Sequence, residues 1–343
     1  MFELDKLVRP NIRSLTPYSS ARDEFQGKEG IFLDANENPF GTLNRYPDPY
    51  QRELKKAISR IKNIPEEKIF LGNGSDEIID LCFRIFCTPG SDKALTFYPT
   101  YGMYEVAASV NDIEIIKIHL NDDFQININD ITPWLSDNNL KLILICSPNN
   151  PSGNCIRTET MESLISKFRG IVLVDEAYID FASVPSLKES VAKYPNLIVM
   201  QTFSKAFGMA SARVGMAFAD PGIIKYLNKM KPPYNISSIN QKAVLHRLHA
   251  TDMFKEQVSR IINERERVAS ELKKLSLIKR VYPSDANFLL VKVNDANMTY
   301  NYLVDRKIIV RNRSSVVEGC IRITIGTKAE NNKLLKTLKA FKI

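Results

Sequence analysis

The sequence lacks any long apolar run: no stretch of its 343 residues approaches the roughly 18 residues that a transmembrane helix needs. The first residues, MFELDKLVRPNIR, are rich in charge and contain no apolar core of the kind found in secretion signals. We therefore expect no membrane partner, no export and a cytoplasmic location.

Metal-binding and disulfide patterns are also scarce. The five cysteines, Cys82, Cys87, Cys146, Cys155 and Cys320, form an odd set without a C-x-x-C pair, which favours reduced thiols over a disulfide framework or a zinc site. Of the three histidines, His246 and His249 have helical spacing but no third ligand nearby, so we expect no metal.

Charge is unbalanced but not clustered. The net charge of +8 is spread along the chain without a long block of lysine and arginine, which argues against a nucleic-acid partner. Anionic small molecules remain plausible partners.

The sequence does have the pattern of a large α/β protein. Its length and its 44% content of hydrophobic residues favour two domains. Apolar runs that read as strands buried on both faces occupy residues 141–147, 171–178, 196–202 and 213–219, with a helical stretch at 158–168. This alternation predicts a mostly parallel sheet.

The two prolines of KPPYNI, residues 231–236, suggest a boundary. Beyond it, an amphipathic helix at about 250–275, the strands NFLLVKV and GCIRITIG and a last helix predict a smaller α+β unit. The active site is then expected at the carboxyl ends of the parallel strands, facing the second domain.

Polar residues follow these strands. Asp175 ends one strand, Asn149 and Asn150 follow another within PNNPSG, and a glycine-rich turn leads into a helix at about Ser75. Each has a plainer reading, as a helix cap, a turn, or an incomplete nucleotide motif. A fourth strand end is followed by Lys205, with Arg213 eight residues further on.

Together, this lysine, aspartate, asparagine and glycine-to-helix turn are the parts needed to hold pyridoxal 5'-phosphate. Their order resembles the aspartate-aminotransferase-like fold type I. More narrowly, RPNIRSLTPYSSAR, LDANENP, RYPDP, YPTYGMY, CSPNNPSG, VDEAYIDF and SKAFGMASAR resemble the histidinol-phosphate aminotransferase family, from about residue 9 to the C-terminus. The resemblance implies an arm at residues 1–40 that joins the small domain, a large cofactor-binding domain at 41–233 and a small domain at 234–343.

The resemblance also implies roles for the catalytic residues. Lys205 matches the lysine that bonds covalently to the cofactor aldehyde, which requires an unprotonated amine. Asp175 matches the carboxylate paired with the pyridine nitrogen, and Tyr178 and Asn150 match donors to the ring hydroxyl. Tyr101 matches the aromatic residue that stacks on the ring.

The cofactor phosphate is expected to bind hydroxyl, guanidinium and backbone donors. The residues that match them are Thr202, Ser204, Arg213, Gly74, Ser75 and Asp76. Tyr46 matches a tyrosine that reaches the phosphate in the neighbouring subunit, so the resemblance implies a homodimer.

The substrate residues implied by the resemblance are Tyr18, Asn36, Arg311 and Arg322. Arg322 matches the arginine that holds a substrate carboxylate, and with Tyr18 and Arg311 it would also bind a substrate phosphate. Either arginine alone could instead be an ordinary solvent-facing strand residue. The implied reaction transfers the amino group between L-histidinol phosphate and 2-oxoglutarate, giving imidazole acetol phosphate and glutamate.

One departure and three alternatives stand beside this interpretation. Ser211 replaces a glycine that the family commonly has, without loss of a catalytic group.

The alternatives are a threonine-phosphate decarboxylase, a broad aromatic transaminase and a pyridoxal-sensing transcription regulator. A regulator would carry a DNA-binding module first, and because the matching motifs begin near Arg9 we expect no such module.

Overall fold

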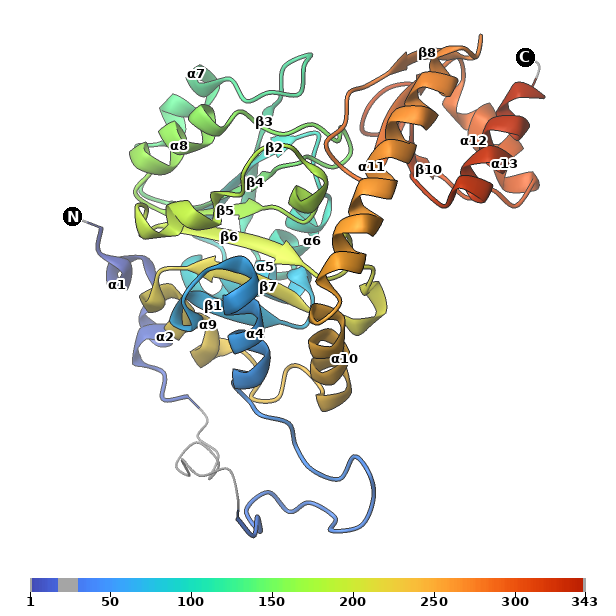
Figure 1. Cartoon of the computed structure of the whole chain (residues 1–343). Helices are drawn as coiled ribbons and strands as arrows, with labels where there is room; N and C mark the ends of the chain where they lie inside the picture. Colours follow the sequence, from blue (N-terminus) through green and yellow to red (C-terminus); the bar gives the residue numbers. More distant parts are fainter. Residues whose placement is uncertain (1, 18–29, 342–343) are drawn as a thin grey trace.

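The computed structural model describes residues 2–17 and 30–341, in which two β-sheets lie side by side (Figure 1). The larger sheet has seven strands in the order β1-β7-β6-β5-β4-β2-β3. Its strands are β1 Ile69–Gly72, β2 Lys93–Tyr98, β3 Glu114–His119, β4 Leu140–Cys146, β5 Ile171–Asp175, β6 Leu197–Thr202 and β7 Gly215–Ala219.

The larger sheet is mostly parallel, as predicted. Strands β2 to β6 pair in parallel, whereas β7 pairs antiparallel with both β6 and β1. The four expected strands are confirmed, but β5 ends at Asp175 rather than residue 178, and β7 begins at Gly215. Arg213 precedes β7 with a left-handed φ of 51°, a conformation that no strand can contain.

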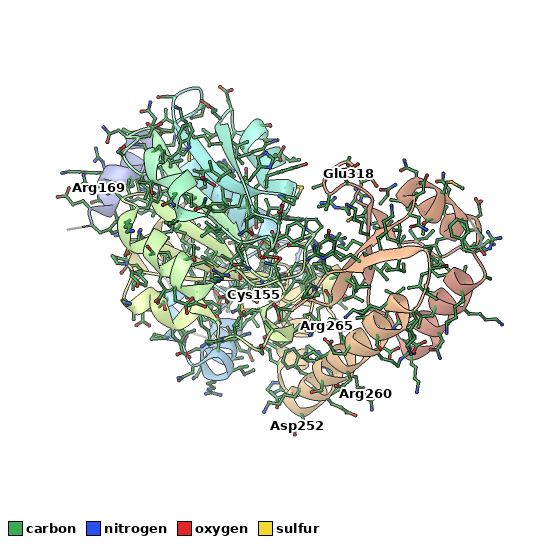
Figure 2. The ribbon with its side chains drawn as sticks, turned by 90° about the horizontal axis from the view of Figure 1, so that it is seen from above. Cys155, Arg169, Asp252, Arg260, Arg265 and Glu318 are labelled. Carbon is green, nitrogen blue, oxygen red and sulfur yellow. The ribbon has the colours of Figure 1, made fainter. Side chains whose placement is uncertain are left out.

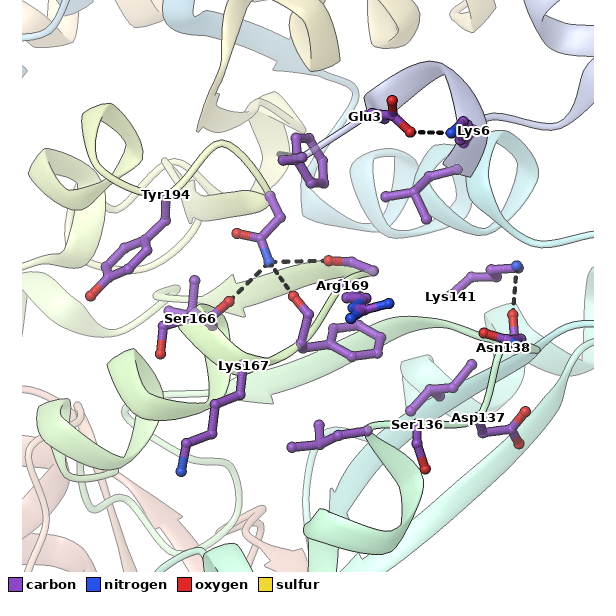
Figure 3. A pocket seen from close by; sticks show the side chains of 18 of the residues that line it. Glu3, Lys6, Ser136, Asp137, Asn138, Lys141, Ser166, Lys167, Arg169 and Tyr194 are labelled. Carbon is purple, nitrogen blue, oxygen red and sulfur yellow. Dashed lines mark hydrogen bonds and ion pairs between the residues drawn. The ribbon is translucent and has the colours of Figure 1, made fainter.

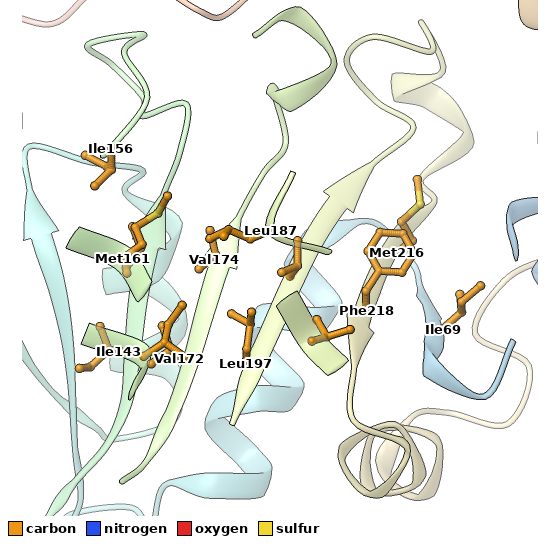
Figure 4. Packing of buried hydrophobic residues seen from close by; sticks show 14 of the residues in the cluster. Ile69, Ile143, Ile156, Met161, Val172, Val174, Leu187, Leu197, Met216 and Phe218 are labelled. Carbon is orange, nitrogen blue, oxygen red and sulfur yellow. The ribbon is translucent and has the colours of Figure 1, made fainter. Parts of the chain in front are cut away.

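Helices cover both faces of this sheet. Alternate strand residues point to opposite faces, so Val172 and Val174 enter one apolar core while Ile171 and Leu173 enter the other. Figure 4 shows the first core, which extends from Ile143 across to Met216 and Ile69. Helices α4 Arg52–Lys62, α8 Thr158–Lys167 and α10 Ser238–Leu248 contribute to it, and α5 Ser75–Phe86, α6 Met103–Val110 and α9 Pro221–Met230 to the other.

The N-terminal helices α1 Leu4–Leu7 and α2 Pro10–Ser14 also pack on the larger sheet. Val8 and Ile12 are buried in the same core as α5 and α9. This part of residues 1–40 therefore contacts the larger unit, whereas the sequence led us to expect it with the small domain. The short helix α7, Ile128–Ile131, lies between β3 and β4 in the chain.

The smaller unit is built on a four-stranded antiparallel sheet, ordered β10-β11-β9-β8. Its elements are α11 Thr251–Lys273, β8 Ile278–Val281, β9 Phe288–Val293, α12 Ala296–Asp305, β10 Arg311–Asn312, β11 Cys320–Thr324 and α13 Lys328–Lys339. The capping box of Thr327 and Glu330 fixes the start of α13. The long helix α11, the strands β9 and β11 and the last helix α13 confirm the α+β unit expected from the sequence.

The two units meet through specific polar contacts. Asp285 of the smaller unit accepts a hydrogen bond from Cys155 N at 3.0 Å and donates its own N–H to Gly153 O at 2.7 Å. Within the smaller unit, Arg265 on the long helix α11 donates to Ala286 O at 2.9 Å and so fixes the segment that carries Asp285. Figure 2 shows Cys155 where the green and orange parts of the chain meet, with Arg265 beside it. The two hydrogen bonds of Asp285 hold the smaller unit against the carboxyl edge of the larger sheet.

No helix in the part of the chain that the structure describes is long and apolar enough to cross a membrane. Within the same residues, no group of three or more histidine, cysteine or carboxylate side chains could hold a metal ion.

Candidate active site

Lys205 lies just beyond the carboxyl end of β6, in a turn that its own sequence builds. Thr202 Oγ1 accepts a hydrogen bond from Ser204 N at 3.1 Å, and Phe203 N donates to Val214 O at 3.1 Å. This fixed turn places Lys205 Nζ 5.6 Å from the centre of the Tyr178 ring. The strand therefore delivers the amine to the same edge of the sheet as Asp175.

Asp175 is a buried carboxylate at the end of β5. Its Oδ1 accepts from Ala177 N at 3.0 Å and its Oδ2 from Tyr104 Oη at 2.8 Å. Burial raises the pKa of Asp175 from 3.8 to about 6, and these two hydrogen bonds hold the rise in check. A carboxylate in this setting is ready to pair with a proton-bearing ligand atom.

Burial lowers the pKa of the Lys205 amine, and the Arg322 guanidinium lowers it further. Part of the Lys205 side chain remains open to solvent, so the effect is weaker than in a closed core. Both influences favour the unprotonated amine that a nucleophilic lysine requires.

The start of α5 forms the second part of the site. Gly74 precedes the helix with φ of 78°, and a Cβ placed on it would lie 2.6 Å from Arg213 Nη2. The positive φ favours glycine here, and any larger residue would have to displace this guanidinium. Arg213 Nη2 also lies 3.2 Å from Asp76 Oδ2, and Tyr101 Oη donates to Asp76 Oδ1 at 3.3 Å. The exposed N–H groups of a helix start and a guanidinium together suit an anionic group such as a phosphate.

Asn150 links the two units of the protein. Its Nδ2 lies 3.5 Å from Tyr178 Oη, and its Oδ1 accepts from Arg322 Nη1 at 2.5 Å. The Tyr178 ring packs edge-on against Phe288 at 5.1 Å, within an apolar cluster shared by both units. The predicted cofactor residues Asn150 and Tyr178 thus stand in one chain of contacts with the predicted substrate residue Arg322.

Three arginines gather on the smaller sheet. Arg311 and Arg322 are directly opposite in the antiparallel pair β10–β11, although like charges at such positions repel. Burial, followed by the two neighbouring guanidiniums, lowers the pKa of Arg313. The buried Nε atoms of Arg313 and Arg322 have no hydrogen-bond partner among the described residues. Such a cluster is favourable when an anion binds it.

The remaining predicted residues lie elsewhere or outside the described chain. Tyr46 stacks on Tyr234 of the same chain at 4.4 Å, and Asn36 is exposed. Both belong to residues 30–50, which project away from the sheets (Figure 1). Tyr18 lies outside the described residues. The single chain therefore brings together the predicted residues from Gly74 to Arg213 and Arg322, but not Tyr46 or Asn36.

Two residues at the site were missed by the motif analysis. Tyr104 is the last residue of YPTYGMY and lies in the first turn of α6, three positions after Tyr101, whose ring it contacts edge-on. Arg313 follows Arg311 by two positions, which places both on one face of an extended segment. These spacings were available in the sequence, but the contacts with Asp175 and Arg322 join distant segments and were not.

The large hollow in Figure 3 lies at the opposite, amino ends of the strands. Its volume is about 1340 Å³, and Lys6, Lys141, Lys167 and Arg169 are among the charged residues that line it. It shares no residue with the cluster around Asp175 and Lys205.

The chain is similar to known proteins over almost its full length. The family model described as aminotransferase class I and II matches residues 25–338. The histidinol-phosphate aminotransferase of Cytophaga hutchinsonii is 49% identical over 347 residues, covering 99% of each chain. The crystal structure of the enzyme of that name from Clostridium acetobutylicum superimposes with a TM-score of 0.80 at 28% identity, covering 87% of this chain and 90% of the other.

A further solved structure, histidinol-phosphate aminotransferase from Sinorhizobium meliloti in complex with pyridoxal-5'-phosphate, has a TM-score of 0.78 at 24% identity. It covers 96% of both chains and shares the fold. The resemblance read from the motifs is thereby confirmed, and so is the aspartate-aminotransferase-like fold type I. The chain belongs to the class I and II aminotransferase family and, within it, to the histidinol-phosphate aminotransferases.

Proposed function

We propose that the chain is a pyridoxal 5'-phosphate-dependent transaminase that moves the amino group between L-histidinol phosphate and 2-oxoglutarate. The products are imidazole acetol phosphate and glutamate, as expected for an enzyme of histidine biosynthesis in the cytoplasm. The observation that carries this proposal is the meeting of Asp175, Lys205 and Arg322 at one sheet edge, in a chain that is 49% identical to histidinol-phosphate aminotransferases.

The residues present fit the cofactor. The cradle at Gly74, which a Cβ would fill, lies between Arg213 and the start of α5 and suits the phosphate. Asp175 is the buried acceptor for the pyridine N–H, and Asn150 and Tyr178 offer donors for the ring hydroxyl. When bound, the cofactor supplies an electron sink for the charge that develops at the substrate Cα.

Lys205 is proposed to hold the cofactor and then to move a proton. Its lowered pKa favours the unprotonated amine, so Nζ would be able to accept a proton from the substrate Cα. Asp175 would hold the pyridine nitrogen of the cofactor in its protonated form, because an ionised carboxylate stabilises an adjacent positive charge. Tyr101 would stack on the cofactor ring and limit its movement.

The substrate anion is proposed to bind the arginine cluster. Arg322 already reaches Asn150, beside the cofactor residues, so it would hold the 2-oxo acid carboxylate as well as the substrate phosphate. Arg311 and Tyr18 would contact the phosphate. The unbonded guanidinium atoms of Arg313 and Arg322 support an anion with many acceptor oxygens.

The proposal includes a homodimer. Residues 30–50, which include Tyr46, project away from the sheets and expose Ile31, Leu33 and Phe40 to 92, 89 and 82%. Covering these apolar side chains with a second copy would stabilise the assembly and bring Tyr46 to the partner's cofactor phosphate. Association should then tighten cofactor binding. A fully active monomer in sedimentation would contradict this part of the proposal.

A substrate panel tests the proposed function. Amino transfer to 2-oxoglutarate is measured with histidinol phosphate, histidinol, phenylalanine and threonine phosphate. We expect histidinol phosphate to be preferred over histidinol by about 100-fold or more, because dephosphorylation leaves buried guanidiniums unpaired. Preference for phenylalanine would indicate a broad aromatic transaminase. Carbon dioxide release from threonine phosphate without 2-oxoglutarate would indicate a decarboxylase.

A further inference from the structure

Tyr104 is a fully buried tyrosine whose hydroxyl meets the carboxylate of Asp175. Its exposed fraction is 0%, and its Oη lies 2.8 Å from Asp175 Oδ2. Burial and the neighbouring carboxylate raise the pKa of the Tyr104 hydroxyl well above its ordinary value, so the hydroxyl stays protonated and donates.

The Asp175 carboxylate has few other partners. Oδ1 accepts from the backbone N–H of Ala177, and the only side-chain hydroxyl bonded to it in the described chain is that of Tyr104. The titratable groups that face Asp175 are Tyr104 on α6, Tyr101 just before α6, Cys146 on β4, Asp76 on α5, Tyr178 after β5 and Lys205 after β6. Of these, Lys205 is cationic and acts without a hydrogen bond.

We propose that Tyr104 is a positioning residue for the proposed transaminase reaction: its hydroxyl keeps Asp175 ionised, so that the shared proton stays on the cofactor's pyridine nitrogen. This inference rests on the proposed function, since it assigns Asp175 to that nitrogen. A hydroxyl that donates to a carboxylate stabilises the ionised form more than the neutral acid. Without it, the proton moves toward Asp175 and the ring becomes a weaker electron sink.

The ring of Tyr104 has a separate task. It packs edge-on against Tyr101 at 5.6 Å, and Tyr101 is the residue predicted to stack on the cofactor. Tyr104→Phe removes the hydroxyl and keeps this ring contact, so the two tasks can be separated in one substitution.

The chain offers a matched control. Tyr226 Oη also donates to an aspartate oxygen at 2.8 Å, but its partner is Asp5 in the exposed N-terminal segment. Tyr226→Phe therefore removes a hydrogen bond of the same kind and length, away from the site.

The test is ¹⁵N NMR of the holoenzyme loaded with cofactor that is ¹⁵N-labelled at the pyridine nitrogen. At neutral pH we expect the wild-type signal at the protonated position. In Tyr104→Phe it should move toward the deprotonated position, because losing a charge-assisted hydrogen bond changes the proton's distribution by about tenfold or more. Turnover should fall by about tenfold with little change in KM. Tyr226→Phe should match wild type in both respects.

A second substitution covers the case in which Tyr104→Phe does not fold. Replacing Tyr104 by 3-fluorotyrosine keeps the ring and makes the hydroxyl a stronger donor, so in a pH titration the signal should stay at the protonated position to a higher pH than in wild type. An unchanged signal in Tyr104→Phe, an opposite shift with fluorotyrosine, or an equal shift in Tyr226→Phe would overturn the inference. A deprotonated nitrogen in the wild type would instead refute the proposed role of Asp175, before any question about Tyr104.

Discussion

The two ends of the seven-stranded sheet are both rich in polar side chains, but they hold them differently. At the carboxyl end, Asp175, Asn150 and Arg322 are buried or half-buried and bond to residues 71 to 172 positions away in the chain. At the amino end, Lys6 contacts its near neighbour Glu3 and Lys141 contacts Asn138 (Figure 3), whereas Asp137 pairs with Lys93 of β2.

The difference shows that the largest opening on a protein need not be its active site; here the large hollow lies at the end of the sheet opposite to the candidate active site. At the amino end, the paired side chains of Lys6 and Glu3 are mostly exposed to solvent. At the carboxyl end, burial shifts the pKa of Asp175 upward and that of Lys205 downward. A raised pKa of an acid and a lowered pKa of a base in one site are typical of catalytic sites.

The largest expected effect comes from Asp175→Asn. The amide cannot stabilise a protonated pyridine nitrogen, so turnover should fall by about 10³-fold or more while the fold is kept. Turnover is measured on the cofactor-loaded variant, with circular dichroism as the check on folding. Near-normal turnover of the loaded variant would show that Asp175 does not have this role.

The next effect separates the two opposed arginines. Arg322→Ala should slow both half-reactions by about 10- to 100-fold, since each charge-assisted hydrogen bond contributes about 1.5–3 kcal/mol. Arg311→Ala should impair chiefly the histidinol-phosphate half. Single-turnover absorbance changes of the bound cofactor measure each half alone. Equal damage by both substitutions to the 2-oxoglutarate half would contradict this division.

A third effect concerns the free energy of unfolding and its dependence on pH. The folded state raises the pKa of Asp175 to about 6, so it binds this proton more tightly than the unfolded chain does. The resulting stability is complete below about pH 4 and is lost as the pH rises to about 6, a change of about 3 kcal/mol. Asp175→Asn abolishes this loss.

Urea unfolding of the cofactor-free protein at several pH values checks this. Between pH 5 and 7 the variant should gain about 1–1.5 kcal/mol relative to wild type. A difference that stays constant over this range would mean that Asp175 has an ordinary pKa in the fold.

The smallest effect is expected at the amino end. Lys167→Ala combined with Arg169→Ala removes two charges from the lining of the hollow, and turnover should stay within about twofold of wild type. Tm is recorded in the same samples. A loss of activity at unchanged Tm would show that the two ends of the sheet are coupled and would break the comparison.

Much of the fold could be predicted from the sequence. Continuous apolar runs ending in Cys146, Asp175 and Thr202 indicated buried parallel strands. The strands β1 to β3 were not identified, and β7 is antiparallel, which periodicity cannot reveal because either direction buries the same residues. The domain limits at 41–233 and 234–343 stay predictions.

The site residues that lie within motifs could be predicted from the sequence. The contacts between segments that are distant in the chain could not. Lys205, Asp175 and Asn150 stand in recognisable motifs, and the structure brings them together, although their roles remain proposals. The contact of Tyr104 with Asp175 joins a helix to a strand 71 residues away, and no local pattern encodes such a distance. Tyr46 needs a partner chain for its predicted role, which one chain cannot provide.

The most direct test of the account asks which lysine holds the cofactor. The holoenzyme is reduced with borohydride, digested, and mapped by mass spectrometry. We predict that the cofactor is attached to the peptide containing Lys205, that Lys205→Ala carries none, and that Lys167→Ala at the amino end is labelled like wild type. Attachment to another lysine, or full labelling of Lys205→Ala, would contradict the placement of the active site at the carboxyl ends of the strands.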